Sequence, residues 1–475
     1  MKYLAAIHFS WFKHINPAKF FLVLSISWGA VLVFLTPPLQ VPDEPRHFLR
    51  AYQVSTLHFN PEINNNRLGG TLPTDFLPFI QHYGAFIRNH NNGQKKLSKE
   101  DYAFGLNQTL NLHQQAFIPL PNTALYSPVA YLPQAIGMAI GTQLNTPPLV
   151  LLYLGRLFNL FAWIILVYWS IRLLPFNQWL FVLLALLPMS IFQAASLSAD
   201  TPTNGLSFLL TSVCLRYSFD DQAQLHRQQI FWIAVLAVLI TLCKNVYTPI
   251  LCLGFMIPKE KFGSNKNYLL TLILLGCLVT AGLAYSAYNV KGLLNQIHPI
   301  ETLYGKEGVP KINPDKQLDL IMSDIPAFLS MVVQSFDTYK KTIYQTFIGR
   351  LAWLDVFFNN WYYHLAWGFL CFVAVTGSAP PKKISMAHRG TMLISCLAVL
   401  LAFSVTMYLS WADVGEKTIS NMQGRYFIPI GPILFSLLAN NIQWKIPQWC
   451  LNTLILLFVL LSMTLTFQVM YLRFF

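Results

Sequence analysis

The chain has 475 residues, of which 55% are hydrophobic and only 11% are charged, and its mean hydropathy is +0.46. A soluble domain typically has about a quarter of its residues charged, so this composition excludes a soluble globular protein. The formal net charge of +13 is of the size seen in nucleic-acid-binding proteins. Here, however, Lys and Arg are scattered over the segments between apolar blocks, as the positive-inside rule produces. We therefore expect an integral membrane protein with no nucleic-acid partner.

The hydrophobic residues are grouped in blocks of roughly 17–25, long enough to cross a bilayer core about 30 Å thick as α-helices. They lack the period-two alternation of barrel strands, and only helices and closed barrels satisfy backbone groups in lipid. The predicted fold class is an all-α integral membrane protein with about ten to twelve transmembrane helices. The blocks are Phe20–Leu35, Tyr126–Gln143, Leu149–Leu174, Trp179–Leu197, Pro202–Tyr217, Ile230–Pro258, Tyr268–Val290, Trp361–Thr376, Thr391–Trp411, Tyr426–Leu438 and Ile446–Leu472.

The first apolar block fixes the orientation of the chain. Lys2, Lys13 and Lys19 precede it, which places the N-terminus in the cytoplasm and the long polar stretch after it outside. We divide the chain into the N-terminus with the first span (1–36), a first external loop (37–124), a core bundle (125–290), a second external segment (291–360) and the C-terminal spans (361–475).

Two blocks are ambiguous. Every basic loop lies in the cytoplasm if two conditions hold. Tyr126–Gln143 is interfacial or re-entrant, or forms one irregular crossing with the block after it. Ile230–Pro258 is a hairpin of two short halves that meet near Lys244. Asp200 then faces outside with the first loop. The alternative treats every block as a simple span and places Asp200 in the cytoplasm. We favour the first arrangement because it satisfies the charge rule throughout.

The most informative motif, Pro-Asp-Glu-Pro-Arg-His-Phe-Leu-Arg-Ala, follows the first span directly. Pro suits the first helical position, so one interpretation is that an acid of this motif caps a helix and does nothing more. The other is functional, because two acids, a histidine and two arginines gather where a lipid-linked substrate presents its head group. A carboxylate can deprotonate an acceptor hydroxyl, and arginines can hold a phosphate. The candidates are Asp43 and Glu44 for catalysis, and Arg46, His47 and Arg50 for substrate binding.

Three further motifs lie beside apolar blocks. Ser198–Asp200 precedes one, and Asp200 is either a loop or cap residue or a second acidic site residue. Gln423–Pro429 brings Arg425 and Tyr426 to the start of another, where the arginine either snorkels or binds substrate. Gly349–Asp355 is more typical of an interfacial aromatic anchor than of a site.

Together these motifs resemble a bacterial family of predicted membrane proteins, a domain of unknown function similar to the GT-C glycosyltransferases. That family's pattern has Pro-Asp-Glu-Pro-x-His with Arg-Ala after the first span, then Ser-x-Asp, a Gly-x-Leu-x-Trp-Leu-Asp-like segment and Gln-Gly-Arg-Tyr-Phe-x-Pro. This chain has each of them, with Arg350 at a usually apolar place.

The resemblance implies a GT-C-like helical bundle whose first external loop carries short helices on the membrane surface. It also implies a glycosyltransferase in the bacterial cytoplasmic membrane, which moves a sugar from a polyprenyl-phosphate carrier to a glycan, lipid or protein acceptor on the outer side. In that scheme Asp43 is the general base, with Glu44 beside it. Arg46, Arg50 or Arg425 stabilises the leaving phosphate.

Some questions stay open at this level. Two adjacent acids, Asp43 and Glu44, can hold a divalent metal such as Mg²⁺ or Mn²⁺, yet a monosaccharide-phosphate donor can react without one. A transporter or flippase for a lipid-linked or anionic substrate also fits intramembrane charge, and a polysaccharide assembly subunit fits the loop-rich layout. The enzyme is favoured because the reactive groups are predicted to lie on one side of the membrane.

Overall fold

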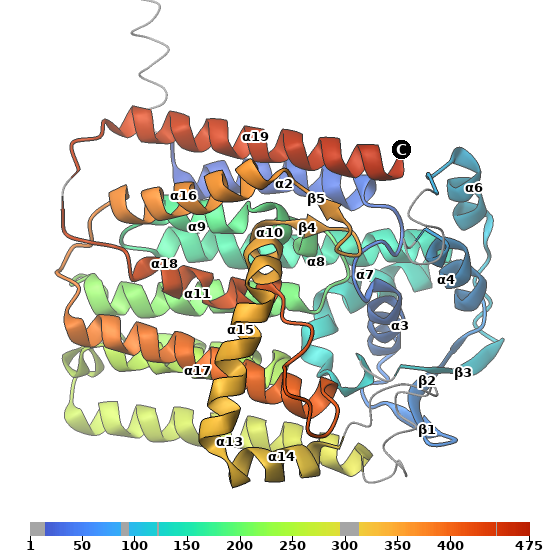
Figure 1. Ribbon diagram of the computed structural model, residues 1–475, viewed down its shortest axis with the longest axis horizontal. Helices are drawn as coiled ribbons and strands as arrows, with labels where there is room; N and C mark the ends of the chain where they lie inside the picture. Colours follow the sequence, from blue (N-terminus) through green and yellow to red (C-terminus); the bar gives the residue numbers. More distant parts are fainter. Residues whose placement is uncertain (1–14, 87–94, 121–122, 295–312, 443) are drawn as a thin grey trace, which may run out of the picture.

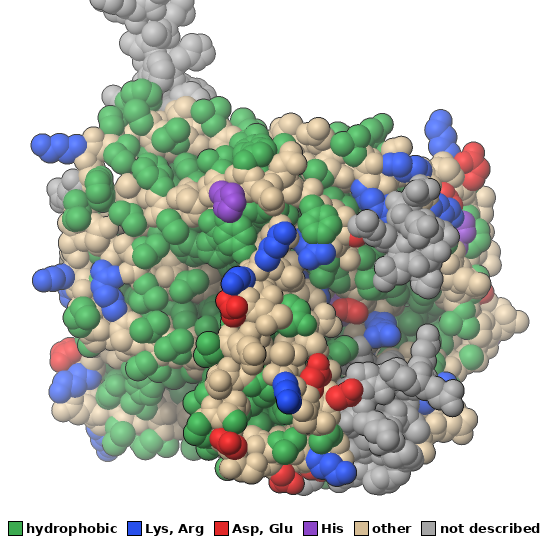
Figure 2. Space-filling model, in the orientation of Figure 1, with side chains coloured by type: hydrophobic (Ala, Val, Ile, Leu, Met, Phe, Trp, Pro, Cys, Tyr) green, Lys and Arg blue, Asp and Glu red, His purple; other side chains and the backbone are tan. Residues whose placement is uncertain are grey.

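The computed structural model describes residues 15–86, 95–120, 123–442 without 295–312, and 444–475, so Lys2 and Lys13 lie outside the described residues. Within these ranges most of the chain is helical, and the axes of most helices are roughly parallel or antiparallel to one another (Figure 1). The prediction of an all-α membrane protein is confirmed. Apolar side chains also cover much of the outer surface of this bundle, as expected where helices face lipid (Figure 2).

Five described helices are long and apolar enough to cross a membrane. They are α2 (Pro17–Leu35), α8 (Pro148–Leu173), α13 (Asn265–Leu294), α17 (Met386–Trp411) and α19 (Gln448–Phe474). The pair α14 (Pro314–Ser323) and α15 (Ile325–Ile348) counts as a sixth if it is one span, bent by 108°. The described part of the segment predicted as a second external region, 291–294 and 313–360, is therefore largely helical, and α15 crosses the other helices steeply (Figure 1).

The remaining apolar blocks are shorter or broken. Pro188 separates two helices within the predicted block Trp179–Leu197, because proline cannot continue the hydrogen-bond ladder. Lys244 has an extended backbone and splits Ile230–Pro258 into two halves that contact each other, as the hairpin interpretation requires. These elements are α7 (Leu132–Gln143), α9 (Gln178–Ala185), α10 (Pro188–Ala194), α11 (Asp200–Phe219), α12 (Arg227–Cys243), η3 (Asn245–Met256), η4 (Lys259–Phe262), α16 (Asn360–Thr376), η6 (Gly424–Ile430) and α18 (Gly431–Ser436).

The described part of the first loop contains short helices and a small sheet. A helix begins at Glu44 with Pro45 in its first turn, and a second one, capped by Ser98 and Asp101, spans Lys99–Asn107. A three-stranded antiparallel sheet of order β1-β2-β3 is not predicted by the sequence, because β1 and β3 are short and β2 contains the pair Gly69-Gly70. The elements are α3 (Glu44–Ser55), β1 (Glu62–Asn64), β2 (Arg67–Pro73), α4 (Phe76–Gly84), α6 (Lys99–Asn107), β3 (Gln115–Pro119), η1 (Thr123–Leu125) and η2 (Pro128–Tyr131); a hairpin of β4 (Arg350–Leu351) and β5 (Val356–Phe357) follows later.

The basic loops meet at the end of the bundle opposite the first loop. Lys261 Nζ donates to three carbonyls of the 220–223 turn at 2.6–2.9 Å, and Lys382 pairs with Asp221 of the same turn. Asp200 begins α11, and a helix of 20 residues is about 30 Å long, so Asp200 lies at the far end from these loops. This separation is the one expected from the favoured interpretation of the ambiguous blocks.

Candidate functional site

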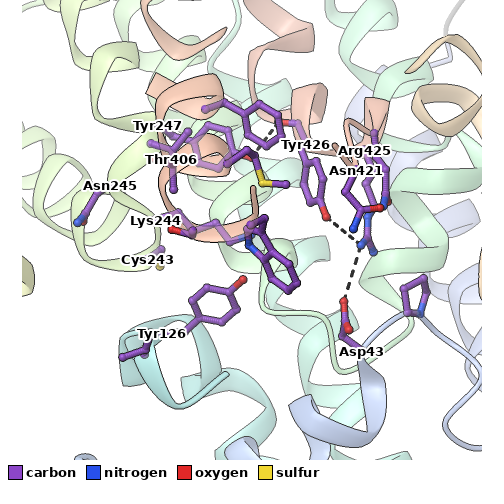
Figure 3. A pocket seen from close by; sticks show the side chains of 18 of the residues that line it. Asp43, Tyr126, Cys243, Lys244, Asn245, Tyr247, Thr406, Asn421, Arg425 and Tyr426 are labelled. Carbon is purple, nitrogen blue, oxygen red and sulfur yellow. Dashed lines mark hydrogen bonds and ion pairs between the residues drawn. The ribbon is translucent and has the colours of Figure 1, made fainter. Parts of the chain in front are cut away.

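A cavity of about 580 Å³ lies at the end of the bundle that carries the first loop (Figure 3). Segments far apart in the sequence form its wall, including the corner before α3, the break between α12 and η3, the C-terminal part of α17 and the start of η6. Its polar and aromatic lining includes Asp43, Arg46, Tyr126, Lys244, Asn245, Tyr247, Trp353, Asn421, Gln423, Arg425 and Tyr426.

Asp43 faces this cavity instead of capping α3. Its backbone is left-handed, with φ of 61°, and its side chain makes no capping hydrogen bond. One carboxylate oxygen lies 4.0 Å from Nη2 of Arg425, and the side chain is 48% exposed (Figure 3). The structure therefore does not support the interpretation of Asp43 as a simple helix cap, and its carboxylate is accessible to a ligand.

Arg425 reaches the cavity from η6, which packs closely against α15. Gly424 permits this approach, because a Cβ there would collide with the Ile343 carbonyl and lie 2.6 Å from the Phe347 nitrogen. The Arg425 side chain is only 8% exposed, and Nη2 lies 3.2 Å from the Tyr426 hydroxyl. Its buried Nε has no hydrogen-bond partner among the described residues. A buried guanidinium with unused donors is suited to an oxyanion.

Lys244 is a second, half-buried cation of the cavity. It forms an ion pair with Asp200, whose other oxygen accepts from Gln193 Nε2 at 3.1 Å. Its Nζ also lies 5.4 Å from the ring centre of Tyr126 and 5.9 Å from that of Tyr426, within cation–π range. Asp200 does not itself line the cavity, so it contributes by holding Lys244.

Glu44 has a different role from its neighbour. Its side chain is fully buried, and Arg156 of α8 binds both carboxylate oxygens at 2.9 and 2.6 Å. Arg156 also donates to the carbonyls of Val33, Thr36 and Pro37. Glu44 does not line the cavity. This ion pair holds the turn between α2 and α3 in place, and therefore also fixes the position of Asp43.

The other candidates of the first motif divide into two groups. Arg46 is exposed and lines the cavity. Arg50 is buried behind it and donates to backbone carbonyls, including that of Tyr126 at 3.3 Å. His47 is buried, with Nδ1 2.8 Å from the hydroxyl of Tyr131. Burial lowers the pKa of His47 to about 4, although the carboxylates of Asp43 and Asp200 act in the opposite direction. His47 is therefore neutral at pH 7.

The sequence left metal binding by Asp43 and Glu44 open, and their geometry does not favour it. Arg156 and the Leu197 N–H already occupy the Glu44 carboxylate, so the two acids cannot act as joint ligands. No group of three or more His, Cys, Asp or Glu residues suited to a metal occurs in the described part of the chain.

The Gly349–Asp355 motif contributes one residue to the cavity and one to the scaffold. Trp353 lines the cavity, and its indole N–H donates to the carbonyl of Leu39 at 3.2 Å. Asp355 instead forms an ion pair of 3.0 Å with Arg473 near the C-terminus. The expectation of a purely interfacial anchor is therefore incomplete, because Trp353 belongs to the site.

Sequence reasoning missed two cations. The sequence predicts Lys244 only as the tip of a hairpin, and it does not single out Arg156 inside the block Leu149–Leu174. Both carried a usable signal, because a charged residue within an apolar span is expensive and therefore points to a site or a buried partner. Tyr126 and Trp353 carried no such signal, since aromatic residues are common at membrane boundaries.

Residues 26–434 match the model of a family described as predicted membrane protein, DUF2142. The chain belongs to this family. The matched region contains every residue that lines the cavity. No curated protein and no solved structure matches the chain. Membership of the DUF2142 family therefore agrees with the multi-pass membrane fold and leaves the activity to be inferred from the site.

Proposed function

We propose that the protein is a glycosyltransferase that moves a sugar from a polyprenyl-phosphate carrier to a hydroxyl acceptor, namely a glycan, lipid or protein. The observation that carries this proposal is the pairing of Asp43 with Arg425 in one cavity, at the end of the bundle that carries the first loop. Sugar transfer with a phosphate leaving group needs two groups. One is a carboxylate that accepts the acceptor's proton, and the other is a buried guanidinium with unused donors for the phosphate.

In the proposed reaction Asp43 takes the proton of the acceptor hydroxyl as that oxygen attacks the anomeric carbon. The bond between the anomeric carbon and the phosphate oxygen breaks, and its electron pair leaves with the polyprenyl phosphate. Arg425 stabilises the charge that develops there, and Lys244 adds a second positive charge to the same cavity. Arg46, exposed at the edge, can meet the head group as it enters. Glu44, His47, Arg50 and Asp200 position these groups.

The charges of the site suit an anionic donor. The cavity lining has one acid, Asp43, and the cations Arg46, Lys244 and Arg425. Asp200 neutralises Lys244 from outside the lining, and Arg50 is a further buried cation that binds the Tyr126 carbonyl. A net positive charge therefore remains for a phosphate group.

We further propose that the cavity faces the outer side of a bacterial cytoplasmic membrane, with the N-terminus inside. The support is the cluster of basic loops at the opposite end of the bundle, where the positive-inside rule places the cytoplasm. An impermeant thiol reagent should label Arg46→Cys in intact cells and Lys382→Cys only after permeabilisation. The reverse result would invert the orientation.

The transfer itself is tested with purified protein in lipid nanodiscs, given polyprenyl-phosphate hexoses and membrane-derived acceptors. We expect a glycosylated product that depends on Asp43 and Arg425. The broken helix at Lys244 also suits a transporter or flippase, since interrupted helices form transport sites. Movement of the sugar lipid across a vesicle membrane, with no glycosyl transfer by the same preparation, would favour that function. An assembly subunit would show neither activity alone.

A further inference from the structure

We propose that Trp353 and Gln423 form a subsite for the sugar ring of the substrate, beside the phosphate position at Arg425. This inference rests on the proposed function of the same cavity. Both residues line that cavity, and neither is accounted for by proton transfer or by phosphate binding.

Trp353 presents carbon atoms, not its polar atom, to the cavity. Its only polar side-chain group, the indole N–H, is already bonded to the Leu39 carbonyl. The side chain is half-buried and lines the cavity, so a ligand meets the flat ring. The C–H face of a pyranose is apolar and flat, and it packs well against such a ring.

The segments joined by this hydrogen bond hold an unusual concentration of strained backbone. Apart from asparagines and glycines, five described residues have positive φ, and four of them lie here. Leu39 and Asp43 have φ of 63° and 61°, and Ala352 and Leu354 on either side of Trp353 have φ of 51° and 62°. Strain of this kind persists only where the surroundings fix it, and it often marks sites that must hold one geometry.

The hairpin that carries Trp353 is held from several directions. Arg350 Nε donates to the Leu354 carbonyl at 2.5 Å, and the Tyr363 hydroxyl donates to the Gly349 carbonyl at 2.8 Å. Asp355 is tied to α19 through Arg473. The ring is therefore mounted on a fixed support, as a specificity surface requires.

Gln423 supplies the polar part of the subsite. It is 7% exposed, and its Oε1 is buried without a hydrogen-bond partner among the described residues. Buried amides are normally satisfied, so such an atom points to a missing partner. The amide both donates and accepts, and so does a sugar hydroxyl. Two residues further on, the Arg425 Nε–H is a buried donor that also lacks a partner among the described residues. The three groups together match a hexose 1-phosphate, with the ring on Trp353, a hydroxyl at Gln423 and the phosphate at Arg425.

The test uses glucose, galactose and mannose 1-phosphates as water-soluble probes on the protein in nanodiscs, by saturation-transfer difference NMR and calorimetry. We expect at least one probe to bind with ring C–H protons saturated, about tenfold more weakly in Trp353→Leu, with Trp353→Phe in between. Trp361→Leu, which changes an exposed tryptophan of α16 outside the cavity, should bind as the wild type does. Gln423→Met should lower the preference for the hexose over its monodeoxy derivatives about tenfold.

Binding of inorganic phosphate as tight as that of all three sugar phosphates would overturn the subsite, and so would unchanged binding in the folded Trp353→Phe and Gln423→Met variants. Thermal unfolding identifies folded variants. The subsite and the proposed function fail separately. Trp353-dependent sugar binding without any transfer would retain the subsite and remove the transferase. Transfer with an unchanged KM for donor in both variants would retain the transferase and remove the subsite.

Discussion

The Arg425 guanidinium lies 4.0 Å from the Asp43 carboxylate, although the two residues come from opposite ends of the chain. The corner after the first span supplies one partner and the close contact of η6 with α15 supplies the other. Both segments must therefore be in place before the site exists. This dependence gives mutations predictable effects on either the chemistry or the scaffold.

Asp43→Asn should abolish proton removal while leaving the fold intact, because the Asp43 side chain makes no capping hydrogen bond. Loss of a general base lowers the rate by about 10²–10⁴-fold. Transfer is measured at matched protein levels, together with the unfolding temperature. Asp337→Asn, which changes an exposed acid paired with Lys340, is the control and should be neutral. Full activity in Asp43→Asn would remove Asp43 from the mechanism.

Glu44→Gln should act on stability more than on chemistry. The change leaves the fully buried Arg156 without its carboxylate partner, and breaking a buried pair costs about 3–5 kcal/mol. We expect a lower unfolding temperature and less folded protein, measured by tryptophan fluorescence in detergent. A Glu44→Gln protein that is as stable as the wild type yet inactive would instead assign Glu44 a direct part in the reaction.

Lys244→Met should lower both stability and activity, because Asp200 is left buried without its cation. The expected loss of stability is again about 3–5 kcal/mol. In the double variant Lys244→Met, Asp200→Asn the uncompensated charge is gone, so stability should recover in part while activity should not. Recovery of activity in the double variant would show that Lys244 has no role beyond neutralising Asp200.

His47 should make stability depend on pH below 6.5. Its pKa in the folded protein is about 4, mainly because of burial, against an ordinary value of 6.5. Between these values the unfolded chain binds more protons, so stability rises with pH through this window and is flat above it. The loss by pH 4 is up to about 3 kcal/mol. Unfolding followed from pH 4 to 7 should show a weaker pH dependence in His47→Asn, and an unchanged one would contradict the assignment.

Gly424→Ala should displace Arg425. The added Cβ would meet the Ile343 carbonyl and the backbone nitrogen of Phe347, neither of which can move without moving α15. We expect lower stability and loss of transfer. Gly276→Ala in α13 is the matched control, because nothing lies within 4 Å of its added Cβ, and alanine should stabilise that helix by about 0.5–1 kcal/mol. Normal activity in Gly424→Ala would separate η6 from the site.

The sequence alone determined the features that depend on local physics. The length and apolarity of the blocks determine that this is a membrane protein. The acid-proline motif determines where α3 begins, and the lysine inside an apolar block determines the break after α12. The charge rule also separated the basic loops from Asp200. Adjacent residues with the same chemistry, however, looked equivalent.

Only the tertiary structure distinguished Asp43 from Glu44. Arg156 of α8 buries one carboxylate, and the left-handed backbone turns the other toward Arg425. Contacts between residues distant in sequence likewise form the short sheet in the first loop and the hydrogen bond from Trp353 to the Leu39 carbonyl. Local sequence propensity does not predict such contacts, because the two partners are distant in sequence and interact only after packing brings them within a few ångströms.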